Sequence, residues 1–497
     1  MRTKIINMKN PFFQIYFLFM IIINISIFKC ETQYVYFPLK PKDDTYLKSL
    51  NNITQIMKYI YLEPLISELV IGDSGQRVNF IFRTDCLYSY LTSKNHKTSK
   101  PDQTYDLIRK KFGDLSYYNP EESKSKIYYD RNKNYSHPYD NQFKAQLMNE
   151  KMIINGNNTK YNINSNMTLA DYIELEESGA ICLQIQDDIN VQFTPTLPVI
   201  LKKYTNIINN YLWFIYFSKD NKNDYLVLGI TPDNFTNPKT GKKIYPNLNI
   251  TNRHFTTNDA LSVSKPDMTF IIEDVYLLEN DNETKIDFGK ELVNKGKLMP
   301  NIGFIVGTKN YSIYIENNFF GQYLQNGKCH KDIFTQRPDL VGQEYTFYYC
   351  QESLYDTMKS SFKTIIFKQL DFREDFELTF NDLFIKQNGY LIFMVLFSTH
   401  QHLNWDLGRP FMKKYQFEFD FDNKIIGYYK IDNEVVENNI LKYVLITIGA
   451  ILLSIGLVVL GVFIGKKYFQ LRKKRANELD DEFDYQQNKE PSPIIQE

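Results

Sequence analysis

Hydrophobic and polar positions alternate along most of the chain in short runs that are rich in aromatic and β-branched residues and are separated by polar turns. This pattern is typical of half-buried β-strands. Helical periodicity is sparse, and its best candidates are 47–62 and 197–212. The polar stretch 95–165 predicts long loops around a few strands. We therefore predict a mainly β chain, with strands at 78–82, 211–217, 223–229, 268–278, 311–315, 345–350, 362–367, 376–380 and 390–397.

Two apolar segments predict the relation of the chain to a membrane. Residues 1–30 begin with basic residues and continue into an apolar run, which is the layout of a secretory signal peptide. The cleavage site is poorly marked, so an uncleaved signal anchor is the alternative. Residues 444–465 contain no charged side chain and are long enough to cross a hydrocarbon core of about 30 Å. We expect a single transmembrane helix there.

Basic residues follow this second segment at once, and such residues stay on the cytoplasmic side of a span. The predicted topology is therefore type I, with the body of the chain in the secretory lumen or outside the cell and the tail 466–497 in the cytoplasm. Gly461 and Gly465 have the spacing that lets two helices pack closely, as do Ala450 and Ser454. A homodimer through this helix is one interpretation, and the ordinary abundance of small residues in spans is the other.

Charge and length exclude some classes of function. The 497 residues include 58 basic and 58 acidic side chains, so no net charge favours nucleic acid. Aromatic residues make up 15% of the chain, which fits pleated, half-buried strands. The length is sufficient for two or three domains and a large core.

Cysteines and glycosylation motifs fit an oxidising compartment. If Cys30 leaves with the signal peptide, four cysteines remain and allow three pairings. A local bridge between Cys329 and Cys350 is the plainest choice, and Cys86 and Cys182 would then pair by default. Metal binding is the competing interpretation, but the cysteine spacings match no zinc pattern and the histidines are scattered. We predict no metal and no cofactor. The candidate N-glycosylation sites are Asn52, Asn134, Asn157, Asn166, Asn234, Asn249, Asn282 and Asn310.

The stretch 68–91, ELVIGDSGQRVNFIFRTDCLYSYL, resembles the first catalytic region of the pepsin-like aspartic peptidase family. In that family, a strand ending in Ile-Gly leads through a turn and a Gln into a second strand, which ends in the catalytic Asp-Thr-Gly turn. The resemblance places Arg83 at the catalytic Asp, Thr84 at the Thr and Asp85 at the Gly. SGAICLQI, 178–185, is similar to the strand that runs behind this turn in the family.

The second catalytic turn of the family is similar to IGFIVGTKNYSIYI, 302–315. Here Gly307 takes the place of the Asp, Thr308 matches the Thr, and Lys309 takes the place of the Gly. Cys329 and Cys350 match the usual disulfide of the second lobe. The closing segment, NWDLGRPFMKKYQFEFDFDNKIIGYY, is the most specific match, at Leu407, Gly408, Phe411, Tyr415, Phe419, Asp420, Lys424, Ile426 and Gly427.

The resemblance implies a bilobal pepsin-like fold, with an N-terminal lobe at 31–200 and a C-terminal lobe at 201–435. It also places Cys86 after the first turn and Cys182 on the strand behind it, within bridging range. Two buried free thiols are the alternative. Arg83 is expected to pair with Asp85 or to point into the cleft, and a solvated surface arginine is the simpler interpretation.

Aspartic proteolysis needs two carboxylates that share one proton. Both catalytic positions lack a carboxylate here, and Arg83 and Lys309 would keep a nearby Asp85 ionised. In the second lobe, nothing lies nearer than Glu316. We therefore predict a membrane-anchored protein without peptidase activity, which binds an extended peptide or a protein in its cleft. The alternatives are an active aspartic endopeptidase with unrecognised carboxylates, and a surface adhesion or coat protein.

Overall fold

The computed structural model divides the chain into two compact units, Met1–Ile431 and Asp432–Glu497. Each unit is described by itself. Residues 1–32, which include the predicted signal peptide, lie outside the described residues. The structure describes residues 33–84, 89–97, 103–114, 116–130, 144–157, 159–172, 179–183, 196–218, 222–244, 253–256, 268–279, 282–283, 294–335, 344–372, 374–400, 404–430, 456 and 462–475.

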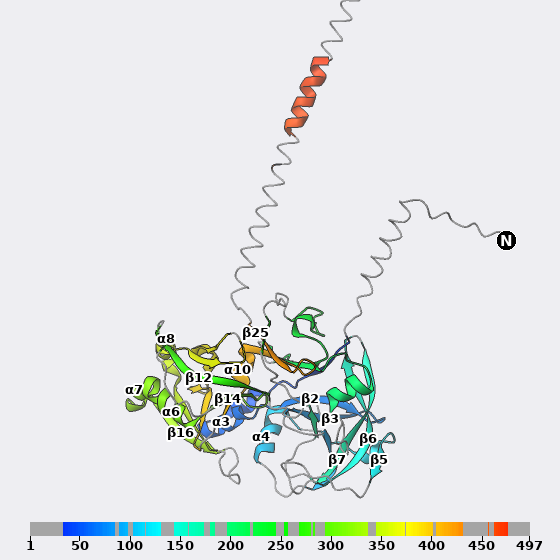
Figure 1. Ribbon diagram of the computed structural model, residues 1–497, viewed down its shortest axis with the longest axis vertical. Coiled ribbons are helices and arrows are strands. Elements are labelled where there is room, and N and C mark those ends of the chain that lie inside the picture. Colours follow the sequence, from blue (N-terminus) through cyan, green and yellow to red (C-terminus); the bar gives the residue numbers. More distant parts are fainter. Residues whose placement is uncertain are drawn as a thin grey trace, which may run out of the picture. The chain divides into compact units, whose positions relative to one another are not determined.

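The first unit is built on two β-sheets, so the prediction of a mainly β chain is confirmed (Figure 1). In sheet 1, β6, β2, β3, β8, β4 and β7 form a closed ring, because β7 also pairs with β6. The pairing order of sheet 1 is β11 (Arg253–Phe255), β25 (Ile425–Lys430), β24 (Tyr415–Asp420), β9 (Leu212–Tyr216), β10 (Tyr225–Leu228), β1 (Val35–Pro38), β6 (Lys144–Gly156), β2 (Leu65–Ile71), β3 (Gln76–Arg83), β8 (Gly179–Cys182), β4 (Tyr90–Lys97) and β7 (Lys160–Tyr172), with β5 (Ile127–Asp130) beside β6.

Sheet 2 is formed by residues between β11 and β24 of the chain. Its order is β19 (Phe376–Leu378), β18 (Ile365–Gln369), β12 (Thr269–Glu279), β14 (Asn294–Leu298), β23 (Asn404–Leu407), β15 (Ile305–Gly307), β22 (Val395–Ser398), β17 (Glu344–Gln351), β21 (Tyr390–Phe393) and β20 (Phe384–Gln387), with β13 (Asn282–Glu283) beside β12 and β16 (Cys329–Thr335) beside β17.

Sheet 1 combines strands of the predicted N-terminal lobe with five strands of the predicted C-terminal lobe. These five are β9, β10, β11, β24 and β25. The chain therefore enters sheet 2 after β11 and returns to sheet 1 at β24, and residue 200 does not mark the change of sheet. One continuous cluster of buried apolar side chains includes Phe80 and Phe82 of sheet 1 and Phe393 and Phe397 of sheet 2. A shared core of this kind explains why contacts do not divide the two sheets into separate units.

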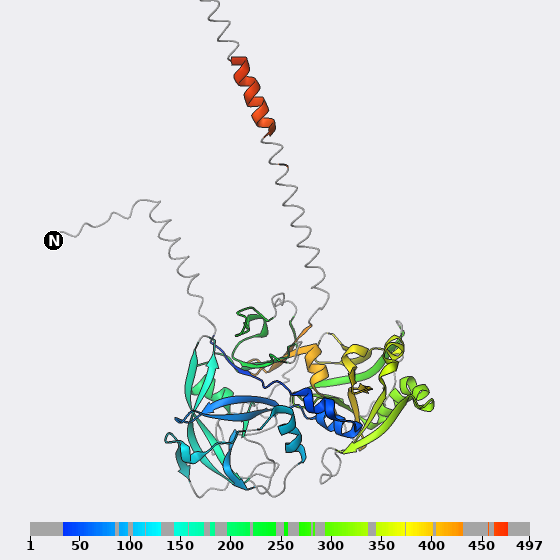
Figure 2. The ribbon, with the colours of Figure 1, turned by 180° about the vertical axis from the view of Figure 1, so that it is seen from behind.

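Short helices join and cover the strands (Figure 2). They are α2 (Asp44–Ser49), α3 (Ile53–Tyr61), α4 (Gln103–Phe112), α5 (Leu197–Val199), α6 (Lys309–Ile315), α7 (Gly321–Gln325), α8 (Tyr355–Ser361), α9 (Phe380–Leu383) and α10 (Arg409–Lys414), the 3₁₀ turns η1 (Pro120–Glu122), η4 (Pro232–Asn234) and η7 (Glu352–Leu354), and the π-helical turns η3 (Ile200–Tyr204) and η6 (Glu316–Phe320).

The helix predicted at 47–62 is present as α2 and α3. The break falls before Asn52, whose side chain accepts a hydrogen bond from Gln55 N at 3.2 Å and so caps α3. α3 packs on the face of sheet 2 that carries Val306, Phe347 and Leu396. The predicted helix at 197–212 extends only to Tyr204, and β9 begins at Leu212.

The strand predicted at 311–315 is wrong. Residues 311–315 form part of α6 instead of a strand, because Tyr311 and Ile315 are one helical turn apart and both are buried, while Ile313 is 55% exposed. In the stretch 95–165, where the sequence predicts long loops around a few strands, the described residues include the strands β5 and β6 and the start of β7, and also the helix α4, which was not predicted. β6 and β7 pair over almost their whole length.

Among the described residues, no helix is both long enough and apolar enough to span a membrane. The predicted span at 444–465 lies mostly outside them, with only Gly456 and residues 462–465 included.

Candidate functional site

The first predicted turn lies at the end of β3. Here β3 runs parallel to β8, with Arg83 opposite Cys182, and Leu183 N donates to Arg83 O at 3.0 Å. The Arg83 side chain is half-buried, and Thr84 is only 8% exposed. Arg83 is therefore not a fully solvated surface residue. Asp85, its predicted partner, lies outside the described residues.

The second predicted turn lies at the end of β15, and its first position has no room for a side chain. A Cβ atom on Gly307 would lie 2.6 Å from Cζ3 of Trp405. The Trp405 ring is 2% exposed and packs edge-on against the rings of Tyr311 and Phe367, each at 5.1 Å between centroids. An aspartate at 307 would thus need the buried indole to move. Lys309, two positions on, is exposed at the start of α6.

The two turn positions share the same strand surroundings. β3 is parallel to β8, and β8 is antiparallel to β4. In sheet 2, β15 is parallel to β22, and β22 is antiparallel to β17. Arg83 and Gly307 each end the first strand of such a set. The chain therefore repeats one local arrangement in both sheets.

The disulfide predicted between Cys329 and Cys350 is confirmed. These two residues face each other in the β16–β17 pair. Cys182 is also disulfide-bonded. Cys86, its predicted partner, lies outside the described residues, so that pairing stays a prediction.

Glu316, the second-lobe carboxylate nearest to the predicted turn in sequence, is already engaged. It forms an ion pair with Lys331 at 2.6 Å and accepts a hydrogen bond from the Tyr348 hydroxyl at 2.9 Å. Burial alone would raise the pKa of Glu316, but these hydrogen bonds and the charge of Lys331 lower it below its usual value. A carboxylate held ionised in this way is a poor candidate for a proton-sharing acid.

The buried carboxylates of the first unit also have polar partners. Glu150 accepts hydrogen bonds from the hydroxyls of Tyr118 and Ser125. Asp224 accepts from Ser218 N and Oγ, each at 2.8 Å. Within the part of the chain that the structure describes, no group of three or more His, Cys, Asp or Glu side chains could hold a metal ion.

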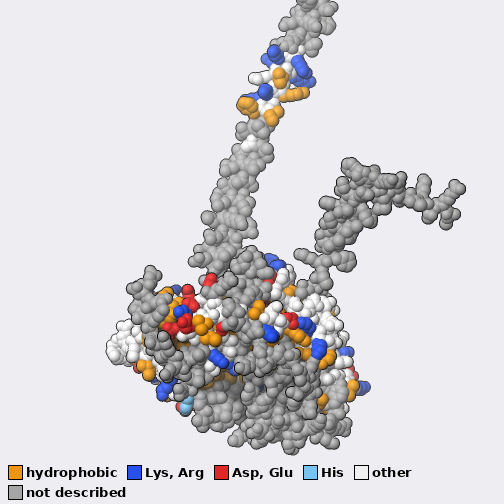
Figure 3. Space-filling view, viewed as in Figure 1, with side chains coloured by type: hydrophobic (Ala, Val, Ile, Leu, Met, Phe, Trp, Pro, Cys, Tyr) orange, Lys and Arg blue, Asp and Glu red, His pale blue; other side chains and the backbone are white. Residues whose placement is uncertain are grey.

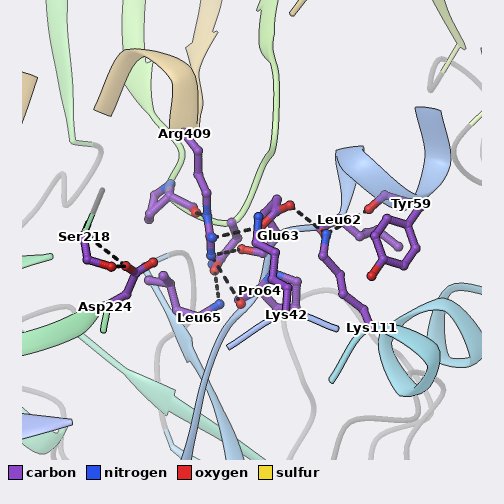
Figure 4. Close-up of polar contacts among 12 residues, drawn as sticks. Lys42, Tyr59, Leu62, Glu63, Pro64, Leu65, Lys111, Ser218, Asp224 and Arg409 are labelled. Carbon is purple, nitrogen blue, oxygen red and sulfur yellow. Dashed lines mark hydrogen bonds and ion pairs between the residues drawn. The ribbon is translucent and has the colours of Figure 1, made fainter. Parts of the chain in front are cut away.

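The most charged buried cluster joins segments that lead to both sheets (Figure 4). The Glu63 carboxylate, between α3 and β2, pairs with Lys42, with Lys111 Nζ at 2.7 Å and with an Arg409 guanidinium nitrogen at 2.8 Å. We call these four residues the Glu63 cluster. Burial alone would raise the pKa of Glu63, but the three cations lower it far below its usual range.

Backbone contacts extend the Glu63 cluster. Lys111 also donates to the carbonyl oxygens of Tyr59 at 2.9 Å and Leu62 at 2.7 Å, at the end of α3. Arg409 donates to Glu63 O at 2.7 Å and to Pro300 O at 3.1 Å. Because α10 follows β23 of sheet 2 and Glu63 precedes β2 of sheet 1, the cluster is a structural junction between them.

Sequence reasoning missed Trp405 and the Glu63 cluster. Trp405 is one of only two tryptophans in the chain and precedes the Leu-Gly pair of the closing segment, a signal that could have drawn attention to it. No signal identifies the cluster, because its members are separated by up to several hundred positions.

The structure separates the five sequons whose side chains it describes into two groups. Asn52, Asn234 and Asn310 are exposed, whereas Asn157 and Asn166 are half-buried. The backbone of Asn282 lies in β13, and Asn134 and Asn249 lie outside the described residues.

We expect glycans at Asn52, Asn234 and Asn310, which are exposed, and low occupancy at Asn166, which is half-buried and paired within the β6–β7 ladder. Enzymatic deglycosylation in heavy-oxygen water followed by peptide mass spectrometry would measure the occupancy of each site. Higher occupancy at Asn166 than at Asn310 would contradict this expectation.

No family model and no curated protein sequence matches this chain.

Proposed function

We propose that the chain is a membrane-anchored, pepsin-like protein that has no peptidase activity and binds an extended peptide or a protein. The repeated strand arrangement around Arg83 and Gly307 supports the pepsin-like part of this proposal, since a bilobal fold with two equivalent turns would produce it. The predicted anchor at 444–465 supports the membrane part.

The packing at Gly307 is the main observation that supports the proposed absence of peptidase activity. A shared-proton mechanism needs one carboxylate from each turn, about 3 Å apart. At the second turn, Trp405 occupies the space that a side chain at 307 would need. The packing at this turn therefore requires a glycine at position 307. Mutating Gly307 to aspartate alone would not produce a pair of carboxylates.

The charges at the two turns support binding of an acidic ligand. Arg83 is half-buried and Lys309 is exposed, so each turn carries a cation where the family has an acid or a glycine. Exposed backbone edges and side pockets of a pepsin-like fold would still accept an extended peptide. We expect the bound peptide to carry an acidic residue near its centre.

The full chain in nanodiscs, incubated with a mixed peptide library between about pH 3 and 7, tests the proposal. We expect retention of acidic peptides without cleavage. The charge reversal Arg83→Glu with Lys309→Glu should weaken this retention about fivefold. The matched reversal Lys48→Glu with Lys328→Glu changes two exposed lysines elsewhere and should leave it unchanged.

Three outcomes would contradict the proposal. Cleavage that a statine-type inhibitor blocks would establish an active peptidase. Absence of any retained peptide or protein would favour an adhesion or coat protein. Equal losses of peptide retention in both charge-reversed variants would show that binding does not depend on the charges at the two turns.

A further inference from the structure

Apart from Gly456, the described part of the second unit is a helix over 462–475 with a strongly basic composition. Every residue of this helix is exposed, and none of them is acidic. Figure 3 shows it covered by blue and orange side chains. The basic residues are Lys466, Lys467, Arg472, Lys473, Lys474 and Arg475. The exposed large apolar residues are Val462, Phe463, Ile464, Tyr468, Phe469 and Leu471.

The order of these side chains along the helix matters more than their position around it. At 100° per residue, the basic residues lie on all sides, so the helix has no single apolar face. Instead, Val462, Phe463 and Ile464 come first and Arg472 to Arg475 come last. With a rise of about 1.5 Å per residue, the helix is about 20 Å long. The first basic pair, Lys466 and Lys467, follows Ile464 within about 5 Å of rise, which is no more than the thickness of one headgroup layer, about 5–8 Å.

Tyr468 and Phe469 lie between these two ends and are 69% and 71% exposed. Aromatic side chains of this kind favour the interface between hydrocarbon and water. A cluster of four to eight Lys and Arg residues directly beyond a span is the pattern that attracts anionic lipid. Lys466 and Lys467 come before the aromatic pair, and long Lys side chains at the end of a span extend to the headgroups. The order from the apolar start to the basic end therefore follows the direction from hydrocarbon to water.

We propose that residues 466–475 bind the anionic headgroups of the leaflet in which the apolar segment 444–465 ends. This inference rests on the membrane anchoring of the proposed function, but it adds a lipid preference that anchoring alone does not require. Each Lys or Arg near an anionic surface raises local partitioning about fivefold, and salt screens the effect over about 10 Å.

The variant Phe469→Trp in the full chain places a fluorophore in the interfacial part of the helix. The two native tryptophans, Trp213 and Trp405, are 1% and 2% exposed in the first unit and give a constant background. The chain is placed in two kinds of nanodisc, both made of phosphatidylcholine with a minority of phosphatidylserine. In one kind the phosphatidylcholine is brominated, and in the other the phosphatidylserine is brominated. We expect brominated phosphatidylserine to quench the introduced indole at least about threefold more than its mole fraction predicts, and this excess to fall with added salt.

A second variant on the same background replaces all six basic residues by glutamine, and the excess quenching should disappear. Its matched control replaces six exposed lysines of the first unit and should keep the excess; these are Lys48, Lys124, Lys160, Lys242, Lys328 and Lys359.

Equal quenching by both brominated lipids, in proportion to their amounts, would overturn the lipid preference but leave the membrane anchor intact. Quenching by neither lipid, with the protein recovered in the aqueous fraction after alkaline extraction, would instead overturn the anchor. Excess quenching that survives the six glutamine substitutions would assign the preference to another part of the chain.

Discussion

Replacing Gly307 by alanine is expected to lower the free energy of unfolding by about 1–3 kcal/mol, because the new methyl group overlaps the buried Trp405 indole. Gly307→Asp should cost more, since it adds a buried charge to the same overlap. Chemical unfolding followed by tryptophan fluorescence measures both effects, and Trp405 reports directly on the site.

A control and a coupling test make this prediction specific. Gly321→Ala, at the start of α7, adds the same methyl group near a single carbonyl oxygen at 3.1 Å and should change stability much less. Trp405→Leu leaves space beside residue 307, so Gly307→Ala should cost less in that background than in the native chain. Additive effects of the two substitutions would contradict the packing described here.

The same packing predicts a negative result for activity. The double variant Arg83→Asp with Gly307→Asp places an acid at both positions where the resemblance to aspartic peptidases expects one, yet we expect no peptide hydrolysis at acid pH. The second carboxylate would have to share its position with the indole ring. Hydrolysis by this variant would show that the Trp405 ring moves aside at little cost.

Replacing Glu63 by glutamine is expected to destabilise the first unit by about 3–5 kcal/mol, because it leaves Lys42, Lys111 and Arg409 around a buried neutral group. Glu68→Gln is the matched control. Glu68 forms an ion pair with Arg77 at 2.8 Å, but both side chains are well exposed, so the loss should stay below about 1 kcal/mol.

The Glu63 cluster also predicts a pH dependence. The pKa of Glu63 is lowered in the folded protein relative to about 4.5 in the unfolded chain, so the unfolded state takes up its proton first as the pH falls. The stabilisation from Glu63 is therefore complete above about pH 4.5 and is lost progressively as the pH falls below that value. When unfolding is measured between pH 7 and 2, the free energy of unfolding should fall less with acid in Glu63→Gln than in the wild type. Glu68→Gln should leave this pH dependence unchanged. If the free energy of unfolding falls with pH as steeply in Glu63→Gln as in the wild type, the acid destabilisation comes from other carboxylates.

The sequence predicted strands best where alternation was uninterrupted. The predicted strands at 78–82 and 223–229 lie within β3 and around β10, because their apolar residues are continuous in the chain. The positions of β6 and β7 within 95–165 were not predicted, for a physical reason. Their buried positions do alternate, at Met148, Glu150 and Met152, but a buried glutamate stands among them and its burial depends on Tyr118 and Ser125.

The segment 311–315, in helix α6, shows the opposite error, because a strand was predicted there. Its aromatic and branched residues alternate like a strand, but Tyr311 and Ile315 face the core from a helix. Local pattern could not decide between the two, because the contact of Tyr311 with Trp405 joins residues that are far apart in the chain.

By itself, the sequence determined which runs form most strands and that Cys329 and Cys350 lie close enough in the chain to bridge, and it supplied the resemblance that singles out Arg83 and Gly307. Only the tertiary structure decided that Trp405 fills the space beside Gly307 and that one buried carboxylate holds three cations from distant segments. The physical reason is that alternation and turn chemistry act between neighbours in the chain, whereas packing space and buried charge depend on residues that meet only after folding.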